Sequence, residues 1–338
     1  MKLVRYLLFP FAILYDLITS IRNFLYDIGS SQSTSFDIPL IAVGNLSVGG
    51  TGKTPQIEYL IRLLQQKKIA VLSRGYKRKT SGFVLVNENH SSEDVGDEPL
   101  QFFRKFSSIS VAVNANRVQG IKELKEKVDP EVILLDDAYQ HRKLKAGFYV
   151  LLTKYGDLYA DDFILPTGNL RESRRGAKRA DVIIVTKCPE MMTLNDQESI
   201  VKRLKPLENQ EMFFTTISYG NMLKGARPVA MDDLSDYEIL LVTGIAIPEP
   251  LLDFLQGKKI QYRHLKYPDH HHFSKSDIDT IKREFEALSS VKKMIVTTEK
   301  DYVRLSDTIT DLSYIEIETR FLKGKDEFDN KILEFAVV

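Results

Sequence analysis

Short apolar runs alternate with helix-periodic segments along most of the chain. Polar or glycine-containing loops separate the runs from segments whose apolar residues recur every three or four positions. Strands are expected over residues 40–43, 69–72, 83–86, 109–113, 132–135, 182–185, 238–243, 261–265 and 293–298. This alternation of strands and helices is typical of the α/β fold class.

A change in composition near residues 205–236, where Pro and Gly become frequent, indicates a boundary within the chain. Phe213-Phe214-Thr215-Thr216-Ile217 within it has the pattern of a linker strand. We therefore expect an N-terminal helix over residues 1–30, a larger domain over 31–212, a linker over 213–236 and a smaller α/β domain over 237–338.

The N-terminal segment departs from this pattern. Residues 3–15 are almost wholly apolar, but Pro10 and Asp16 interrupt the run before the ~20 residues that a membrane span requires. Basic residues precede the run, as in a signal peptide, yet no small-residue cleavage pattern follows, so export is not expected. One helical face carries Leu14, Leu17, Ile18, Ile21, Leu25 and Ile28, and the other carries Asp16, Ser20, Asn23 and Asp27. Two interpretations remain: a buried core helix, or an amphipathic helix lying in a membrane surface.

Composition narrows the function classes. The 338 residues are enough for about two domains. Lys and Arg total 47 against 46 Asp and Glu, so the net charge of +1 provides no global field for nucleic acid. Cys188 is the single cysteine, which excludes an internal disulfide and favours a reducing compartment. No segment indicates an obligate protein partner.

A glycine-rich loop follows the first apolar run and precedes a helix, the arrangement of a phosphate-binding P-loop. It reads Ser47-Val48-Gly49-Gly50-Thr51-Gly52-Lys53-Thr54. Glycines allow backbone N–H groups to face phosphate oxygens, and the helix N-terminus adds partial positive charge. Lys53 is expected to reach the β- and γ-phosphates of the nucleotide and Thr54 to bind Mg²⁺. Ser47 replaces the usual first glycine of the motif, and a glycine-rich turn without a ligand is the alternative.

Two acidic stretches are candidates for chemistry. The apolar run over 132–135 ends in Asp136 and Asp137, and in a P-loop fold the end of such a strand is where Mg²⁺ is bound. Asp97 precedes a helix expected to begin near Leu100. Its carboxylate is a candidate general base for an attacking hydroxyl, while a simple complement to the helix dipole is the alternative.

Two loops carry unusual side chains. Residues 165–176 are irregular and charged, which fits an active-site lid or a plain surface loop. Residues 266–273 contain three consecutive His, which cannot converge on one metal from regular structure, so zinc is not expected. One His beside Asp269 is a candidate for proton transfer, and an exposed loop is the alternative. Pro189 stands where a guanine-reading loop has Asp, which disfavours GTP.

Taken in order, these motifs resemble the tetraacyldisaccharide 4'-kinase family, the lipid A 4'-kinases. The resemblance extends from about residue 38 to 301, and the family shares the Ser47 departure. Ala138-Tyr139 and Ser173 differ from the family's usual residues. The matching segments are Val43-Gly44-Asn45-Leu46 with the P-loop and Pro55, Ser73-Arg74-Gly75-Tyr76, Gly96-Asp97-Glu98-Pro99, Asp136-Asp137 with Gln140-His141, Leu165-Pro166 with Leu170-Arg171-Glu172, Thr243-Gly244-Ile245-Ala246, Asp269-His270 and Thr298-Glu299-Lys300-Asp301.

The resemblance implies two α/β/α lobes, the larger one P-loop NTPase-like with a mainly parallel sheet, joined by a β-strand linker and preceded by a membrane-associating helix. It implies ATP- and Mg²⁺-dependent transfer of the γ-phosphate to the 4'-hydroxyl of a tetraacyldisaccharide 1-phosphate, a lipid A precursor. The implied location is the cytoplasmic face of the inner membrane of a Gram-negative bacterium. An acylated substrate stays in the bilayer, which favours the interfacial interpretation of residues 1–28.

The resemblance also implies roles for individual residues. Asp97 matches the catalytic base and His270 its partner, while Arg171 and Glu172 match a segment near the nucleotide. Lys53 and Thr54 match the phosphate and Mg²⁺ positions, and Asp136 and Asp137 the acidic pair near the metal. From the residues alone, a membrane-associated P-loop ATPase switch, a non-catalytic nucleotide-binding scaffold and a kinase of a soluble metabolite stay open.

Overall fold

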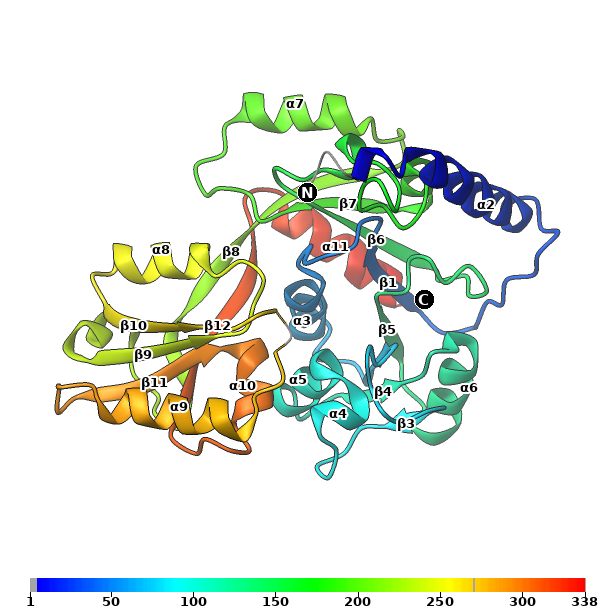
Figure 1. The fold of residues 1–338 in the computed structure, drawn as a ribbon. Helices are drawn as coiled ribbons and strands as arrows, with labels where there is room; N and C mark the ends of the chain where they lie inside the picture. The colour runs from blue at the N-terminus through cyan, green and yellow to red at the C-terminus, as the bar shows by residue number, and fades with distance from the viewer. Residues whose placement is uncertain (1–4, 270, 338) are drawn as a thin grey trace.

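The apolar runs form the strands of one continuous sheet. The computed structural model describes residues 5–269 and 271–337, and within them twelve strands join in the order β10-β9-β11-β12-β8-β7-β6-β1-β5-β2-β4-β3 (Figure 1). The strands are β1 (Leu40–Asn45), β2 (Ile69–Ser73), β3 (Val84–Leu85), β4 (Ser110–Val113), β5 (Val132–Asp136), β6 (Phe148–Lys154), β7 (Val182–Thr186), β8 (Glu211–Gly225), β9 (Glu238–Thr243), β10 (Gln261–Lys266), β11 (Lys293–Thr298) and β12 (Leu312–Phe321).

Helices connect the strands. The α-helices are α2 (Phe9–Asp27), α3 (Lys53–Leu63), α4 (Ser92–Val95), α5 (Asp97–Lys105), α6 (Arg117–Lys127), α7 (Leu194–Leu204), α8 (Glu249–Gly257), α9 (Lys275–Glu286), α10 (Glu299–Leu305) and α11 (Lys325–Ala336). Short 3₁₀ helices are η1 (Tyr159–Asp161), η2 (Arg174–Arg179) and η3 (Met231–Asp236).

Parallel pairs dominate the sheet. Strand β1 pairs in parallel with β5 and β6, and β9 pairs in parallel with β10 and β11, whereas β8–β12 and β3–β4 are antiparallel. Every residue of β1, β2, β5 and β7 is buried, which explains why these strands are continuous apolar runs rather than alternating patterns. The predicted α/β fold with a mainly parallel sheet is confirmed.

Strand β8 links the two halves of the sheet. Its first residues pair in parallel with β7, and the stretch from Thr215 to Gly225 pairs antiparallel with β12. The larger half holds β1–β7 and the smaller half holds β9–β11 (Figure 1). Helix α11 returns to the larger half, where the rings of Phe335 and Phe148 lie 5.3 Å apart. In space, the smaller unit therefore differs from the 237–338 range assigned from the sequence.

The structure contains elements that were not expected from the sequence, namely β6, β12, α4, α7, α10 and α11. Strand β12 has no continuous apolar run, because buried residues such as Ile315 alternate with partly exposed ones. Helix α5 begins at Asp97 rather than near Leu100, so the acidic residues form its first turn.

Helix α2 presents its apolar residues to the outside. Leu17 and Ile18 are 54% and 57% exposed, whereas the polar face packs on the larger half, where Asn23 Nδ2 donates to Glu172 Oε2 at 2.7 Å. The buried residues of α2 are Ala12, Thr19 and Asn23. The interpretation of this segment as a buried core helix is therefore wrong. Within the described residues, no helix combines the length and the apolar character that crossing a bilayer requires.

The fold makes a prediction at Gly44, the β1 residue that faces the turn after β5. A Cβ added there would lie 2.6 Å from the Cβ of Tyr139 and 3.2 Å from its backbone nitrogen, which cannot rotate away. We expect Gly44→Ala to lower the free energy of unfolding by about 1–3 kcal/mol in urea denaturation. Gly257→Ala is the control, because its Cβ would meet nothing within 4 Å. Equal stability of the two variants would contradict the close packing at Gly44.

Candidate active site

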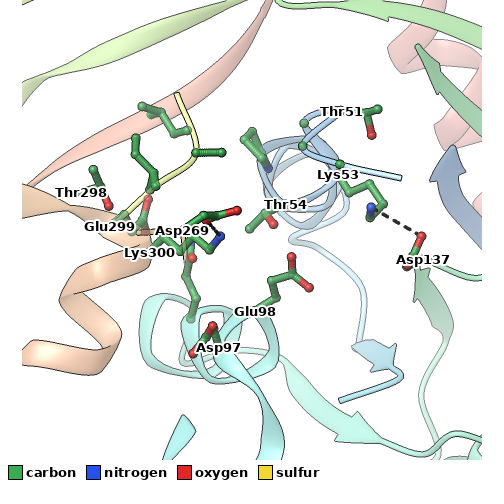
Figure 2. A pocket seen from close by; sticks show the side chains of 18 of the residues that line it. Thr51, Lys53, Thr54, Asp97, Glu98, Asp137, Asp269, Thr298, Glu299 and Lys300 are labelled. Atoms are coloured by element: carbon green, nitrogen blue, oxygen red, sulfur yellow. Dashed lines mark hydrogen bonds and ion pairs between the residues drawn. The ribbon is translucent and has the colours of Figure 1, made fainter. Parts of the chain in front are cut away.

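A cavity of about 1190 Å³ lies between the two halves of the sheet. The carboxyl ends of β1, β2, β5, β6 and β7 reach it from the larger half, and the loops after β9 and β11 reach it from the smaller half. Parallel strands bring their carboxyl ends to the same edge, which is where ligands bind in open α/β sheets. Figure 2 shows side chains from both halves pointing into this space.

The glycine-rich loop forms one wall of the cavity. All residues from 47 to 54 line it, and helix α3 begins at Lys53. Gly49 and Gly52 have φ angles of +113° and +87°, a region that side-chain-bearing residues rarely adopt. Asn45 Nδ2 donates to Thr51 Oγ1 at 2.7 Å and Thr186 Oγ1 donates to the backbone oxygen of Thr51 at 2.8 Å. Hydrogen bonds from the ends of β1 and β7 therefore fix the conformation of the loop at Thr51.

The acidic pair lies at the end of β5, opposite the loop. Asp136 is buried and accepts a hydrogen bond from Ser73 Oγ at 2.8 Å. Burial raises the pKa of Asp136 to about 7, and Glu98 and Asp137 add to the rise. The pKa of Asp137 shifts in the other direction. Burial alone would raise it, but the nearby cations Lys53 and Arg171 lower it below its ordinary value.

Asp137 connects the loop to the segment over 165–176. Lys53 Nζ lies 3.5 Å from Asp137 Oδ1 (Figure 2), and Arg171 Nη1 donates to both oxygens of Asp137, at 3.0 and 2.9 Å. The loop and the segment also bond through their backbones, since Val48 N donates to Asn169 O at 2.8 Å. The segment thus packs against the loop.

Arg171 and Glu172 point to different places. Arg171 lines the cavity, but Glu172 is not among the described residues that do so. The Glu172 carboxylate is buried, where it accepts hydrogen bonds from Arg179 at 2.8 Å and from Asn23 of α2 at 2.7 Å. The geometry therefore supports a nucleotide contact for Arg171, and for Glu172 it supports the anchoring of this segment to α2.

Asp97 lines the cavity from the first turn of α5. Arg304 of α10 binds it with two nitrogens, and its Nε lies 3.1 Å from Asp97 Oδ1. Burial alone would lower the pKa of Arg304, but the hydrogen bond to Asp97 raises it, so the guanidinium stays charged. This contact joins the larger half to the smaller one.

The histidine loop closes the other side of the cavity. His270 lies outside the described residues, while Asp269 and His272 line the cavity. Lys300 Nζ donates to Asp269 Oδ1 at 3.1 Å (Figure 2). His271 instead bonds to Asp277 at 3.1 Å and stacks on Tyr267, a structural arrangement.

Other cavity residues were not singled out in the sequence. Lys154 is the last residue of β6, and Lys187 comes directly after β7. Both line the cavity. Burial lowers the pKa of Lys187, with Lys154 and Lys300 adding to the effect, so these cations crowd one region. The signal that could have found them is position, since a basic residue directly after a buried parallel strand faces the same edge as Asp136.

Comparisons with known proteins agree in family. The model of the family described as "Tetraacyldisaccharide-1-P 4'-kinase" matches residues 4–336. A protein named tetraacyldisaccharide 4'-kinase from Flavobacterium johnsoniae is 54% identical over 99% of this chain and 98% of its own length. One of the same name from Bacteroides thetaiotaomicron is 43% identical over 97% and 92%. The crystal structure of LpxK from Aquifex aeolicus in complex with ATP is 30% identical, covers 98% of this chain and 99% of its own, and has a TM-score of 0.80.

The site geometry makes a prediction at Lys53. A charge-assisted contact to phosphate contributes about 1.5–3 kcal/mol, so we expect Lys53→Met to weaken ATP binding about 10- to 100-fold in isothermal titration calorimetry. Methionine replaces the unbranched aliphatic part of the side chain and lacks the charged ammonium. Lys202→Met, on the exposed face of α7, is the matched control and should leave binding unchanged. Wild-type affinity in Lys53→Met would remove Lys53 from the nucleotide site.

Proposed function

The chain belongs to the tetraacyldisaccharide-1-P 4'-kinase family, and we propose that it transfers the γ-phosphate of ATP to the 4'-hydroxyl of a tetraacyldisaccharide 1-phosphate. The observation that carries the proposal is one cavity lined by a P-loop, an acidic pair and a separate carboxylate, Asp97. Transfer to an alcohol needs a residue that orients the hydroxyl and accepts its proton, and Asp97 provides a carboxylate for this role.

In the proposed site, ATP lies along residues 47–54, with its phosphates facing backbone N–H groups at the start of α3 and the Lys53 ammonium. The oxygen donors of Thr54, Asp136 and Asp137 fit Mg²⁺, which prefers hydroxyl, carboxylate and water ligands. When bound, Mg²⁺ neutralises charge on the phosphate oxygens. Arg171, already held by Asp137, adds a fixed cation at the same edge.

In the proposed transfer, the 4'-oxygen bonds to the γ-phosphorus as the bond to the bridging oxygen of ADP breaks. Asp97 accepts the hydroxyl proton, and Arg304 holds its carboxylate in place. We retain His270 as the partner of Asp97 on the resemblance alone; its neighbour Asp269 lines the same cavity. Closure of the two halves would exclude water and limit hydrolysis of ATP.

The substrate also carries a phosphate and acyl chains. Burial lowers the pKa of His141 to about 4, and nearby cations add to the effect: Arg117, Arg22, Lys143 and Arg74. Arg22 belongs to α2 and Arg74 lines the cavity, so positive charge extends from the exposed helix toward the site. This supports binding of an anionic headgroup beside α2. The cytoplasmic face of the inner membrane is proposed as the location from the family resemblance.

The assay of the proposed function incubates the purified protein with ATP and tetraacyldisaccharide 1-phosphate in detergent micelles. We expect a lipid heavier by one phosphoryl group in mass spectrometry. The deacylated disaccharide 1-phosphate and a sample without lipid are the controls. ATP hydrolysis without a phosphorylated lipid would contradict the proposal and favour an ATPase switch, and equal turnover of the deacylated sugar would favour a soluble-metabolite kinase.

The proposed base makes a prediction of its own. We expect Asp97→Asn to lower kcat about 10²- to 10⁴-fold, the range for loss of a general base, while ATP affinity changes by less than about threefold because the P-loop is untouched. Asp307→Asn is the matched control, since Asp307 pairs with Arg104 at the same helix contact but is exposed. A wild-type kcat in Asp97→Asn would exclude Asp97 as the base.

The membrane role predicts the behaviour of α2. Replacing Leu17 and Ile21, both more than half exposed, by Glu should weaken binding to vesicles of phosphatidylethanolamine and phosphatidylglycerol by a factor of about ten or more, since each buried side chain contributes about 1.5–3 kcal/mol. Substitution is preferable to deletion because Asn23 holds Glu172. Val291→Glu, on the fully exposed tip before β11, is the control. Unchanged sedimentation with vesicles would refute the membrane role.

A further inference from the structure

A buried ion cluster lies where the two halves of the sheet meet. The Lys105 ammonium, at the end of α5, lies 2.6 Å from Glu58, 2.7 Å from Glu299 and 2.7 Å from Glu316. The side chains of Lys105 and of these three acids are between 1% and 13% exposed. We call these four residues the Lys105 cluster. A charge this deeply buried persists only when it is paired, so the Lys105 ammonium links the elements that supply its three carboxylate partners.

The charges of the cluster nearly balance. Burial alone lowers the pKa of Lys105, but the carboxylates raise it, so the ammonium stays charged. Burial raises the pKa of Glu58 and raises that of Glu299 to about 8. Arg62, which lies 3.0 Å from Glu316, supplies the second cation. The acids converge as ligands of a metal ion would, but the ammonium already occupies the centre, so they carry no metal proposal.

Each element that contributes to the cluster also carries residues that line the cavity, which on β12 are Ile315 and Ile317. Glu58 lies one turn after Thr54 on α3. Lys105 ends α5, which Asp97 begins. Glu299 begins α10 and precedes Lys300, the partner of Asp269. Glu316 lies on β12, which pairs with the linking strand β8. Glu58 and Glu299 themselves line the cavity (Glu299 is labelled in Figure 2).

We propose that Lys105 is a positioning residue for phosphoryl transfer. Its ammonium fixes the smaller half against the P-loop helix α3, so that the cavity residues of the smaller half, such as Asp269 and Lys300, face the γ-phosphate. The inference rests on the proposed function for its catalytic part and on the fold alone for its structural part. ATP contacts lie on the larger half, so loss of Lys105 leaves nucleotide affinity intact and lowers turnover. Among the described residues, the ion pairs of Arg62 are with Glu58, Glu316 and Glu318 and not with Glu299, so Arg62 does not replace this link.

The test compares Lys105→Met, which removes the charge, with Lys105→Arg, which keeps it. Lys125→Met is the control, because Lys125 lies near the end of α6 and pairs with Asp37, which is exposed. We expect Lys105→Met to lower kcat at least about tenfold with a change in ATP affinity below about threefold, and Lys105→Arg to recover a large part of kcat. An unchanged kcat, or equal losses of kcat and ATP affinity, would overturn the positioning role.

Lys105→Met leaves buried carboxylates without a partner and can therefore fold poorly. The double variant Lys105→Met with Glu299→Gln removes one charge of each sign and is expected to regain stability without restoring the link. Its kcat should stay low. Recovery of kcat together with the melting temperature would overturn the proposal, because the loss would then come from stability alone.

A distance measurement tests the link without any turnover. Met191→Cys and Val291→Cys give exposed labelling sites on the larger and smaller halves, and the native Cys188 is buried and therefore protected. Pulsed electron spin resonance should give one narrow distance distribution in the parent and a broader one with Lys105→Met. An unchanged distribution overturns the proposal. Because this result is independent of lipid phosphorylation, it separates failure of the link from failure of the proposed function.

Discussion

The active site depends on pairing its partly buried charges across separate parts of the chain. Asp137 is held by Lys53 of the P-loop and Arg171 of the 165–176 segment, and Asp97 is held by Arg304 of the smaller half. An unpaired charge in a partly dehydrated cavity is costly, so each pair restricts the elements that supply it. The closed segment and the position of the smaller half follow from this requirement.

The same pairs prepare the site for a polyanionic ligand. Phosphate oxygens placed beside α3 would compete with Asp137 for Lys53. Arg171 would keep its contact with Asp137, because both of its hydrogen bonds to that carboxylate come from Nη1 and the other nitrogens of the guanidinium can still donate to phosphate. Cations that are oriented before the ligand arrives need little reorganisation during the reaction, which is where electrostatic catalysis gains its strength. Asp97 is likewise oriented by Arg304 rather than by the substrate.

The parts of the site that are contiguous in sequence could be predicted. The loop over 47–54 needs only glycines, a Lys-Thr pair and flanking apolar residues, and Asp136 follows a buried run, so local physics identifies both. The pairing of Asp97 with Arg304 could not be predicted, because it depends on how two helices distant in sequence pack. Strand β12 was missed for a related reason: it is stabilised by β8 and β11 on either side rather than by an apolar run of its own.

Helix α2 shows where periodicity alone is ambiguous. Its apolar stripe correctly predicts an amphipathic helix, but the same stripe fits burial in a core and burial in a bilayer. The hydrogen-bond partners of the polar face decide whether the apolar stripe of α2 faces the core or the outside. Asn23 is buried because Glu172 needs a donor, and Tyr15 donates to the backbone oxygen of Arg171 at 3.1 Å. The helix is therefore fastened by the very segment that carries Arg171 to Asp137. If α2 lies in a membrane surface as we propose, an acylated substrate in that surface lies on the side of the molecule where α2 contacts the segment that carries Arg171, a cation that Asp137 already orients.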